Sequence, residues 1–175
     1  MSARQKLRNP WAPVTYTIMD ELMASPLQPM PAEKRRHQLT RMWDGLVAMQ
    51  TAPEPTPDNW RVVSDAVNLM ETFIRSGPWR DCEGATVFIE DQRGLLNDAV
   101  TALALAGQRR VDHGQAIRMD GPGLQATRAI LEDYAALLDA LPHRSVIQCH
   151  RMTERRIRKV LAGIKQPHDI EVIDL

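Results

Sequence analysis

Cysteine is scarce in this chain, and other scarce features narrow the class of protein further. The 175 residues include two cysteines, Cys82 and Cys149, which is too few for a disulfide-stapled scaffold. No run approaches the ~18 uncharged apolar residues of a membrane span. The first residues also lack the apolar core of a signal peptide. We therefore expect a protein of a reducing compartment, the cytoplasm, without membrane contact.

Net charge is also absent, because 22 basic residues balance 22 acidic ones. This balance argues against a protein that is coated with nucleic acid over its whole surface. The neutrality is nevertheless an average over uneven parts. Residues 1–10 carry three bases and no acid, residues 142–165 carry seven bases and one acid, and residues 166–175 carry three acids and no base. A local basic surface on a neutral domain is therefore the informative pattern.

Signatures of an enzyme are missing as well. The chain has no glycine-rich phosphate loop, no nucleophile elbow and no paired metal-binding cysteines. The best candidate metal ligands are His143, Cys149 and His150, but neighbours on a helix point in different directions, which favours a buried cysteine beside a surface histidine. The Asp112–His113 pair is more typical of a turn than of acid–base chemistry. The sequence thus predicts a non-enzymatic protein, and no cofactor or metal is indicated.

Apolar residues recur at helical spacing in several segments that prolines open or end. Thr56 is predicted to cap one of these helices, and Pro57 to start it. Gly84 and Gly94 mark places where the fourth of these segments can kink or split. Residues 114–119 are expected to form a short extended piece at the surface. The expected helices cover residues 13–23, 31–50, 57–75, 79–109, 122–141 and 146–161. This pattern predicts an all-α fold, a compact bundle of five or six helices.

The charge pattern also suggests a division of the chain. It predicts a basic flexible arm over residues 1–12, a single helical domain over 13–165 and an acidic tail, extended in conformation, over 166–175. Among the tryptophans, Trp43 and Trp60 fall on apolar stripes and are predicted to lie in the core. Trp11 and Trp79 stand beside prolines and are predicted to pack over helix ends; an exposed one would mark a contact site.

The clearest functional clue is "LPHRSVIQCHRMTERRIRKVLAG", residues 141–163. Pro142 breaks the preceding helix, and Ser145 with Gln148 has the spacing of a capping box. Val146 and Cys149 would then face the preceding helix, as in a helix-turn-helix. Two features depart from that motif, because Asp139-Ala140 stands where glycine is preferred and the last helix is longer than usual.

The polar residues of this segment form two groups. The side chains expected to point outward near the start of the helix, where they could meet base edges, are His143, Arg144, Ser145, Gln148 and Arg151. The side chains at the spacing of a phosphate-tracking face are Arg151, Arg155, Arg158 and Lys159. The pattern leaves three interpretations open: a DNA contact, a surface for a protein partner, or a solvated face. A homodimer is a further option.

Three pieces of the chain resemble a family of small helical proteins from proteobacterial temperate phages, prophages and other mobile elements. They are "DAVNLMETFIRSG", "QAIRMDGPGLQATRAILEDYAALLDAL" and "RSVIQCHRMTERRIRKVL". Some members carry the label of Fis-type transcriptional regulators, and "TERRIRKVL" is similar to the DNA-reading helix of Fis proteins. The resemblance implies a regulatory protein that binds a macromolecule. Duplex DNA bound through residues 142–159, helped by the arm, is one form; a protein-binding inhibitor or adaptor, directed for example at a host defence or replication component, is the alternative.

Overall fold

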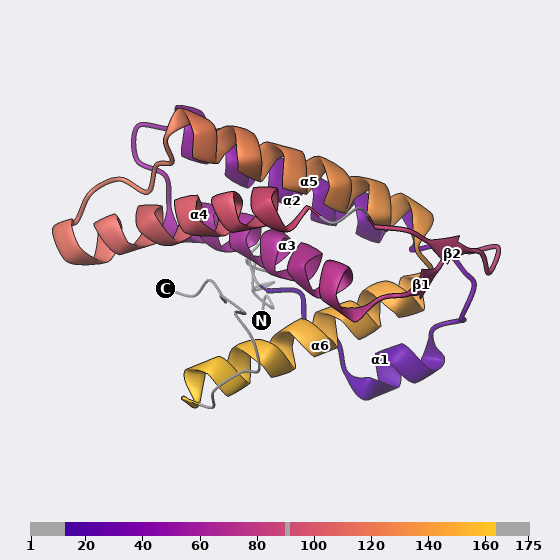
Figure 1. Ribbon diagram of the computed structural model, residues 1–175. Coiled ribbons are helices and arrows are strands. Elements are labelled where there is room, and N and C mark those ends of the chain that lie inside the picture. The colour runs from indigo at the N-terminus through magenta and orange to yellow at the C-terminus, as the bar shows by residue number, and fades with distance from the viewer. Residues whose placement is uncertain (1–12, 90–91, 164–175) are drawn as a thin grey trace, which may run out of the picture.

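The computed structural model describes residues 13–89 and 92–163, so the predicted arm and acidic tail lie outside the described residues. The described part contains six helices and a two-stranded hairpin, and the all-α prediction is confirmed (Figure 1). None of the described helices is long and apolar enough to cross a bilayer. In chain order the elements are α1 (Ile18–Met23), α2 (Ala32–Thr51), α3 (Pro57–Ser76), β1 (Trp79–Arg80), β2 (Thr86–Val87), α4 (Arg93–His113), α5 (Gly121–Ala140) and α6 (His143–Leu161).

Helix α3 is the centre of the fold. Thr56 caps it as predicted: its hydroxyl accepts from the Asn59 N–H at 3.3 Å, and the Asn59 side chain accepts from the Thr56 N–H at 2.9 Å. Pro57 then supplies the first helical residue. Thirteen of the 20 residues of α3 are buried, because α2, α4, α5 and α6 all pack against it. The remaining helices are therefore positioned largely by their contacts with α3.

Two glycines allow close approach between helices of this bundle. A Cβ atom on Gly45 of α2 would lie 2.6 Å from Val62 Cγ2 and 2.9 Å from the Asn59 carbonyl oxygen, both on α3. A Cβ on Gly123 of α5 would lie 2.4 Å from the Ala102 Cβ of α4. The close packing of α2 on α3 and of α5 on α4 therefore requires a glycine, which has no side chain, at each of these positions.

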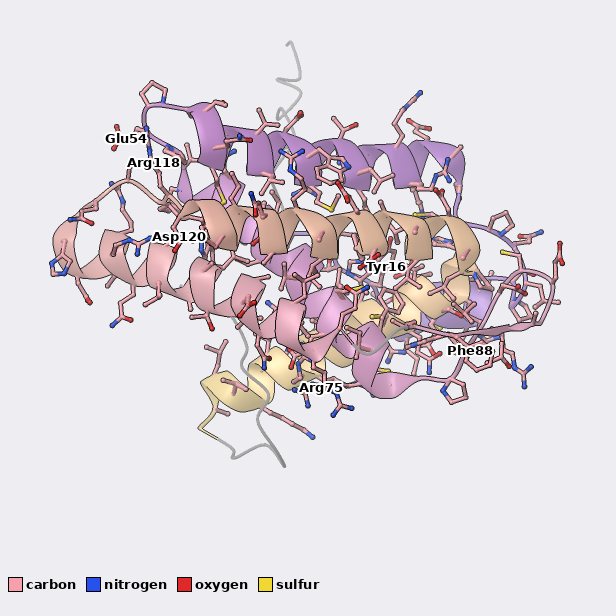
Figure 2. All side chains as sticks on the ribbon, turned by 45° about the horizontal axis from the view of Figure 1, so that its top comes forward. Tyr16, Glu54, Arg75, Phe88, Arg118 and Asp120 are labelled. Atoms are coloured by element: carbon pink, nitrogen blue, oxygen red, sulfur yellow. The ribbon has the colours of Figure 1, made fainter. Side chains whose placement is uncertain are left out.

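The predicted helix over residues 79–109 is wrong in its first part. Trp79 and Arg80 pair antiparallel with Val87 and Thr86, and the helix begins only at Arg93. The Asp81 carboxylate accepts from the backbone N–H groups of Glu83 and Ala85 at 2.9 and 2.8 Å. Gly84 completes the turn with a φ of +84°. This local turn competes with the helix, and it places Phe88 on the surface beside the hairpin (Figure 2).

Trp60 is buried, as predicted, and Trp79 is also buried. The Trp60 indole N–H donates to the Leu103 carbonyl oxygen at 2.9 Å, and that of Trp79 donates to the Phe73 carbonyl oxygen at 2.8 Å near the end of α3. Trp43 is half-buried against the core, and Trp11 lies outside the described residues. Residues 114–119 form no helix, as expected, but Ile117 is fully buried, so the expected surface position is wrong for that residue.

Candidate functional site

Helix α6 begins earlier than the sequence suggested. It starts at His143, so Ser145 lies inside the first turn and makes no side-chain cap; the predicted capping box is wrong. Pro142, with a φ of −59°, already has a helix-compatible backbone angle. The His143 N–H donates to the Gln28 carbonyl oxygen at 2.8 Å, and Pro29 forms a β-bridge with Pro142. The start of α6 is therefore attached to the segment that follows α1.

The packing of α6 also differs from a helix-turn-helix. Cys149 was expected to face the preceding helix, but its thiol donates to the Leu69 carbonyl oxygen of α3 at 3.5 Å. Helix α6 packs mainly on α3 and α1, and Figure 1 shows it crossing beneath α3 rather than running along α5. A helix-turn-helix needs its second helix seated on the first. The expectation that Cys149 faces the preceding helix is therefore wrong. Cys149 faces α3 instead, because α3 offers an apolar face on which α6 packs.

A buried ion pair joins α6 to α3. An Arg156 guanidinium nitrogen lies 2.8 Å from the Glu71 carboxylate and donates to the Asn68 carbonyl oxygen at 3.0 Å. Arg75 contacts the same carboxylate at 2.9 Å, and both Glu71 and Arg156 are buried. This pair was not predicted from the sequence. The available signal was a charged residue on the apolar stripe of each helix. Arg156, for example, lies seven residues, or about two helical turns, after the buried Cys149 and so shares its side of α6.

Helix α1 covers part of the predicted contact surface. Arg151 forms an ion pair with Glu21 of α1, and its side chain is only 14% exposed. The Tyr16 ring lies edge-on to His143 and His150, with centroid distances of 6.1 and 5.1 Å. His143 and Arg151 are therefore engaged by the segment around α1, although the sequence analysis expected them to point into solvent.

The other predicted residues lie on one side of α6. Arg158 pairs with Glu154, the single acid of this helix, at 3.2 Å, and Ser145 is half-buried. Gln148, Arg155 and Lys159 are exposed, and Arg144 is half-buried. These last four residues share one arc of the helix, which we call the basic stripe: Arg144, Gln148, Arg155 and Lys159.

Helix α1 presents its apolar side chains to solvent. Ile18, Met19, Leu22 and Met23 stand at i, i+1, i+4 and i+5, and each is at least 55% exposed. No residue of α1 is buried, because its polar Glu21 faces α6 and its apolar arc faces outward. Leu27, which follows the helix, is 51% exposed. We call these five residues the α1 apolar face. The sequence predicted a helix over residues 13–23 without indicating which way its side chains face, and the helix begins only at Ile18.

His150 is held neutral by its surroundings. Burial, with a smaller contribution from the nearby His143, lowers its pKa to about 4. The Gln38 side-chain nitrogen lies 3.3 Å from His150 Nε2 and donates to it. Cys149 points instead into α3, and burial raises the pKa of its thiol. In residues 13–89 and 92–163 no three His, Cys, Asp or Glu side chains are grouped as metal ligands would be, and Asp112 and His113 lie exposed at the end of α4.

The partly buried His150 leads us to predict a dependence of stability on pH. Its pKa is lower in the folded chain than in the unfolded chain, so unfolding takes up a proton between pH ~6.5 and ~4. The free energy of unfolding should therefore fall as pH falls through this window, by up to about 3 kcal/mol from this group. Urea unfolding at a series of pH values measures it. His150→Gln should flatten the dependence and His37→Gln, at an exposed position, should not; equal slopes for all three proteins would contradict the prediction.

Comparisons with known proteins provide no relative. No family model, no curated protein and no solved structure matches this chain. A function therefore has to be argued from the geometry of α1 and α6.

Proposed function

We propose that the protein is a non-enzymatic regulator that binds another protein through the α1 apolar face. The observation that supports this is the exposure of five large apolar side chains within residues 18–27. Contiguous exposed apolar surface of this kind marks interaction sites in well-folded proteins. We also propose that this regulator belongs to a phage or mobile element, and that part of the proposal rests on the family resemblance alone.

The contacts that fix α1 on α6 support a role for α1 as the helix that docks into the partner. Glu21 is tied to Arg151, and Tyr16 rests against His143 and His150, so α1 is held on α6 with its apolar arc outward. A short helix presented in this way suits insertion into a groove, where residues at i and i+4 act as anchors. Holding it in position beforehand lowers the ordering cost on binding.

The charges on α6, the helix that carries α1, indicate the chemistry of the partner. The basic stripe runs along α6, and its Arg155 and Lys159 are exposed. Rim charges steer encounters and select partners, whereas the apolar centre provides most of the affinity. The partner we propose therefore has an apolar groove bordered by acidic residues. Each large apolar side chain that becomes fully buried would contribute about 1.5–3 kcal/mol before ordering costs.

The proposal predicts that charges on α1 abolish partner capture. The double variant Leu22→Glu with Met23→Glu should reduce retention of the partner from nuclease-treated bacterial lysate at least about tenfold, because carboxylates cannot enter an apolar groove without large desolvation cost. Quantitative pull-down with mass spectrometry measures this. Both residues are exposed, so circular dichroism should show an unchanged fold.

The matched control carries the same charges at exposed apolar positions elsewhere. Leu105→Glu with Val111→Glu alters α4 and should retain the partner as the unchanged protein does. Equal retention by the α1 variant and the control would contradict the proposal.

Duplex DNA is the second candidate, and the basic stripe is the observation that favours it. Arg144, Gln148, Arg155 and Lys159 lie on one arc of α6 without an acid, which suits contact with phosphates and base edges. DNA binding would weaken steeply with added salt, because phosphate contacts release counterions. Arg155→Ala with Lys159→Ala should then lower retention in a low-salt gel shift. Unchanged retention would exclude this candidate, and capture that survives nuclease would favour the protein partner.

A further inference from the structure

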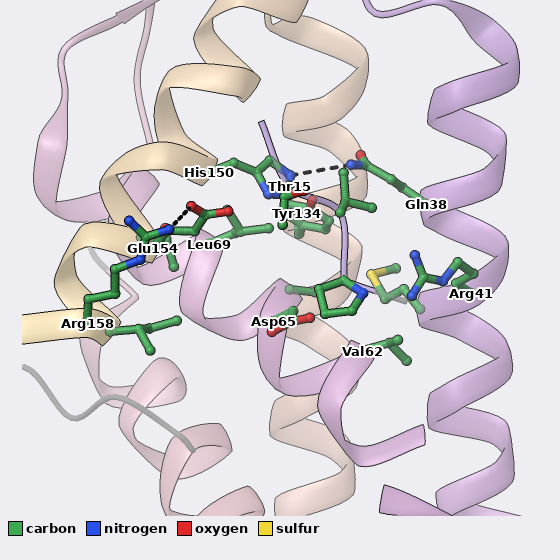
Figure 3. A pocket seen from close by; sticks show the side chains of 16 residues that line it. Thr15, Gln38, Arg41, Val62, Asp65, Leu69, Tyr134, His150, Glu154 and Arg158 are labelled. Carbon is green, nitrogen blue, oxygen red and sulfur yellow. Dashed lines mark hydrogen bonds and ion pairs between the residues drawn. The ribbon is translucent and has the colours of Figure 1, made fainter. Parts of the chain in front are cut away.

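A cavity of about 300 Å³ lies between α2, α3 and α6, apart from the surfaces described above. Residues 13–15 form one wall, and Tyr134 of α5 contributes to another (Figure 3). Its volume is at the lower end of the range typical for small-molecule sites. No residue of the α1 apolar face or of the basic stripe lines it.

The walls of the cavity are largely apolar. The side chains that provide this surface are Pro13, Val14, Met42, Val62, Ala66, Leu69, Tyr134 and Ile157. Five different segments contribute them, so the lining does not belong to a single helix face. Polar side chains also line the cavity, but most of its surface is apolar, which favours ligands with an aromatic or branched aliphatic body.

The charges around the cavity balance one another. Arg158 pairs with Glu154 at 3.2 Å (Figure 3). Burial lowers the pKa of Arg41, and the negative charge of Asp65 acts in the opposite direction by favouring the protonated guanidinium. His150, the remaining titratable base at this site, is neutral at physiological pH. A ligand with net charge would therefore lose its hydration without gaining an unbalanced counter-charge.

We propose that this cavity is a binding site for a small, neutral, mainly aromatic or branched aliphatic molecule. The wall formed by residues 13–15 continues directly into Tyr16, whose ring contacts His143 and His150 beneath α1. A ligand here touches the segment that positions α1, so the site is an effector site for the neighbouring surface. Ligand binding itself does not depend on the proposed protein partner.

Titration with indole tests the site, since indole is neutral, aromatic and small enough for the cavity. We expect saturable binding with a dissociation constant of about 1 mM or below. Methyl-resolved NMR should show shifts concentrated at Val62, Leu69 and Ile157, which line the cavity. Indole-3-acetate and tryptamine, which add a negative and a positive charge, should bind at least about tenfold more weakly. Lack of saturable indole binding, or equal binding of the charged analogues, would overturn the proposal.

Two variants fill the cavity from different sides. Ala66→Leu adds volume on α3, and Ile157→Trp adds it on the partly exposed side of α6, where folding is less sensitive. Each folded variant should weaken indole binding at least about tenfold, whereas Ala104→Leu, on an exposed position of α4, should leave it unchanged. If a folded filling variant binds indole as the unchanged protein does, the site lies elsewhere and the proposal fails.

Discussion

Replacing Arg156 by alanine should lower the free energy of unfolding by about 3–5 kcal/mol, as expected when one partner of a buried ion pair is removed. The Glu71 carboxylate would then keep Arg75 as a contact but lose the 2.8 Å contact with α6. The Asn68 carbonyl oxygen would lose its bond from the guanidinium as well. Chemical denaturation followed by circular dichroism measures the effect.

Two further variants separate the buried pair from ordinary loss of a basic residue. Arg155→Ala, at the neighbouring exposed position, should change stability by less than about 0.5 kcal/mol. Glu71→Leu combined with Arg156→Met should recover most of the loss, because apolar replacement of a whole buried pair is often close to neutral. A loss for Arg156→Ala no larger than that for Arg155→Ala would show that the ion pair does not hold α6 on α3.

The second large effect is expected at Phe73. Its ring is fully buried and lies edge-on to Trp79, with a centroid distance of 5.2 Å, and 6.4 Å from the ring of Tyr134. Phe73→Ala should lower the free energy of unfolding by about 3–5 kcal/mol, through lost transfer energy and the cavity left among three elements. Thermal or chemical unfolding measures it.

The chain contains one other phenylalanine, and it is the matched control. Phe88 is 90% exposed beside the hairpin, so Phe88→Ala should change stability by less than about 0.5 kcal/mol. A similar loss for the two substitutions would contradict the description of the core around α3.

Local signals predicted the helices well where a cap and a proline coincide. Thr56 and Pro57 predicted the start of α3, and the apolar spacing that follows predicted a helix packed in the core. The hairpin at residues 79–87 escaped prediction because its cause is a four-residue turn around Asp81 and Gly84, which a window of helical length averages away.

The candidate site was less predictable, because its features arise between distant segments. Glu21 and Arg151 are 130 residues apart, and nothing local to α6 indicates that α1 covers that arginine. At α1 the sequence predicted a helix, but apolar spacing shows that a helix has an apolar side and not which way that side faces. Burial of Glu71 and Arg156 was likewise a property of two helices together.

The placement of α1 on α6 has a consequence during synthesis. A six-residue helix is far shorter than the ~12–15 residues that give even marginal helicity in isolation, so α1 depends on the contacts that α6 provides. Those contacts involve residues as late as Arg151, near the end of the described chain. A growing chain that has not yet released α6 from the ribosome cannot hold α1 in this position. The surface around α1 is therefore assembled only after α6 is made, and chains that end before α6 would lack it however well their other helices fold.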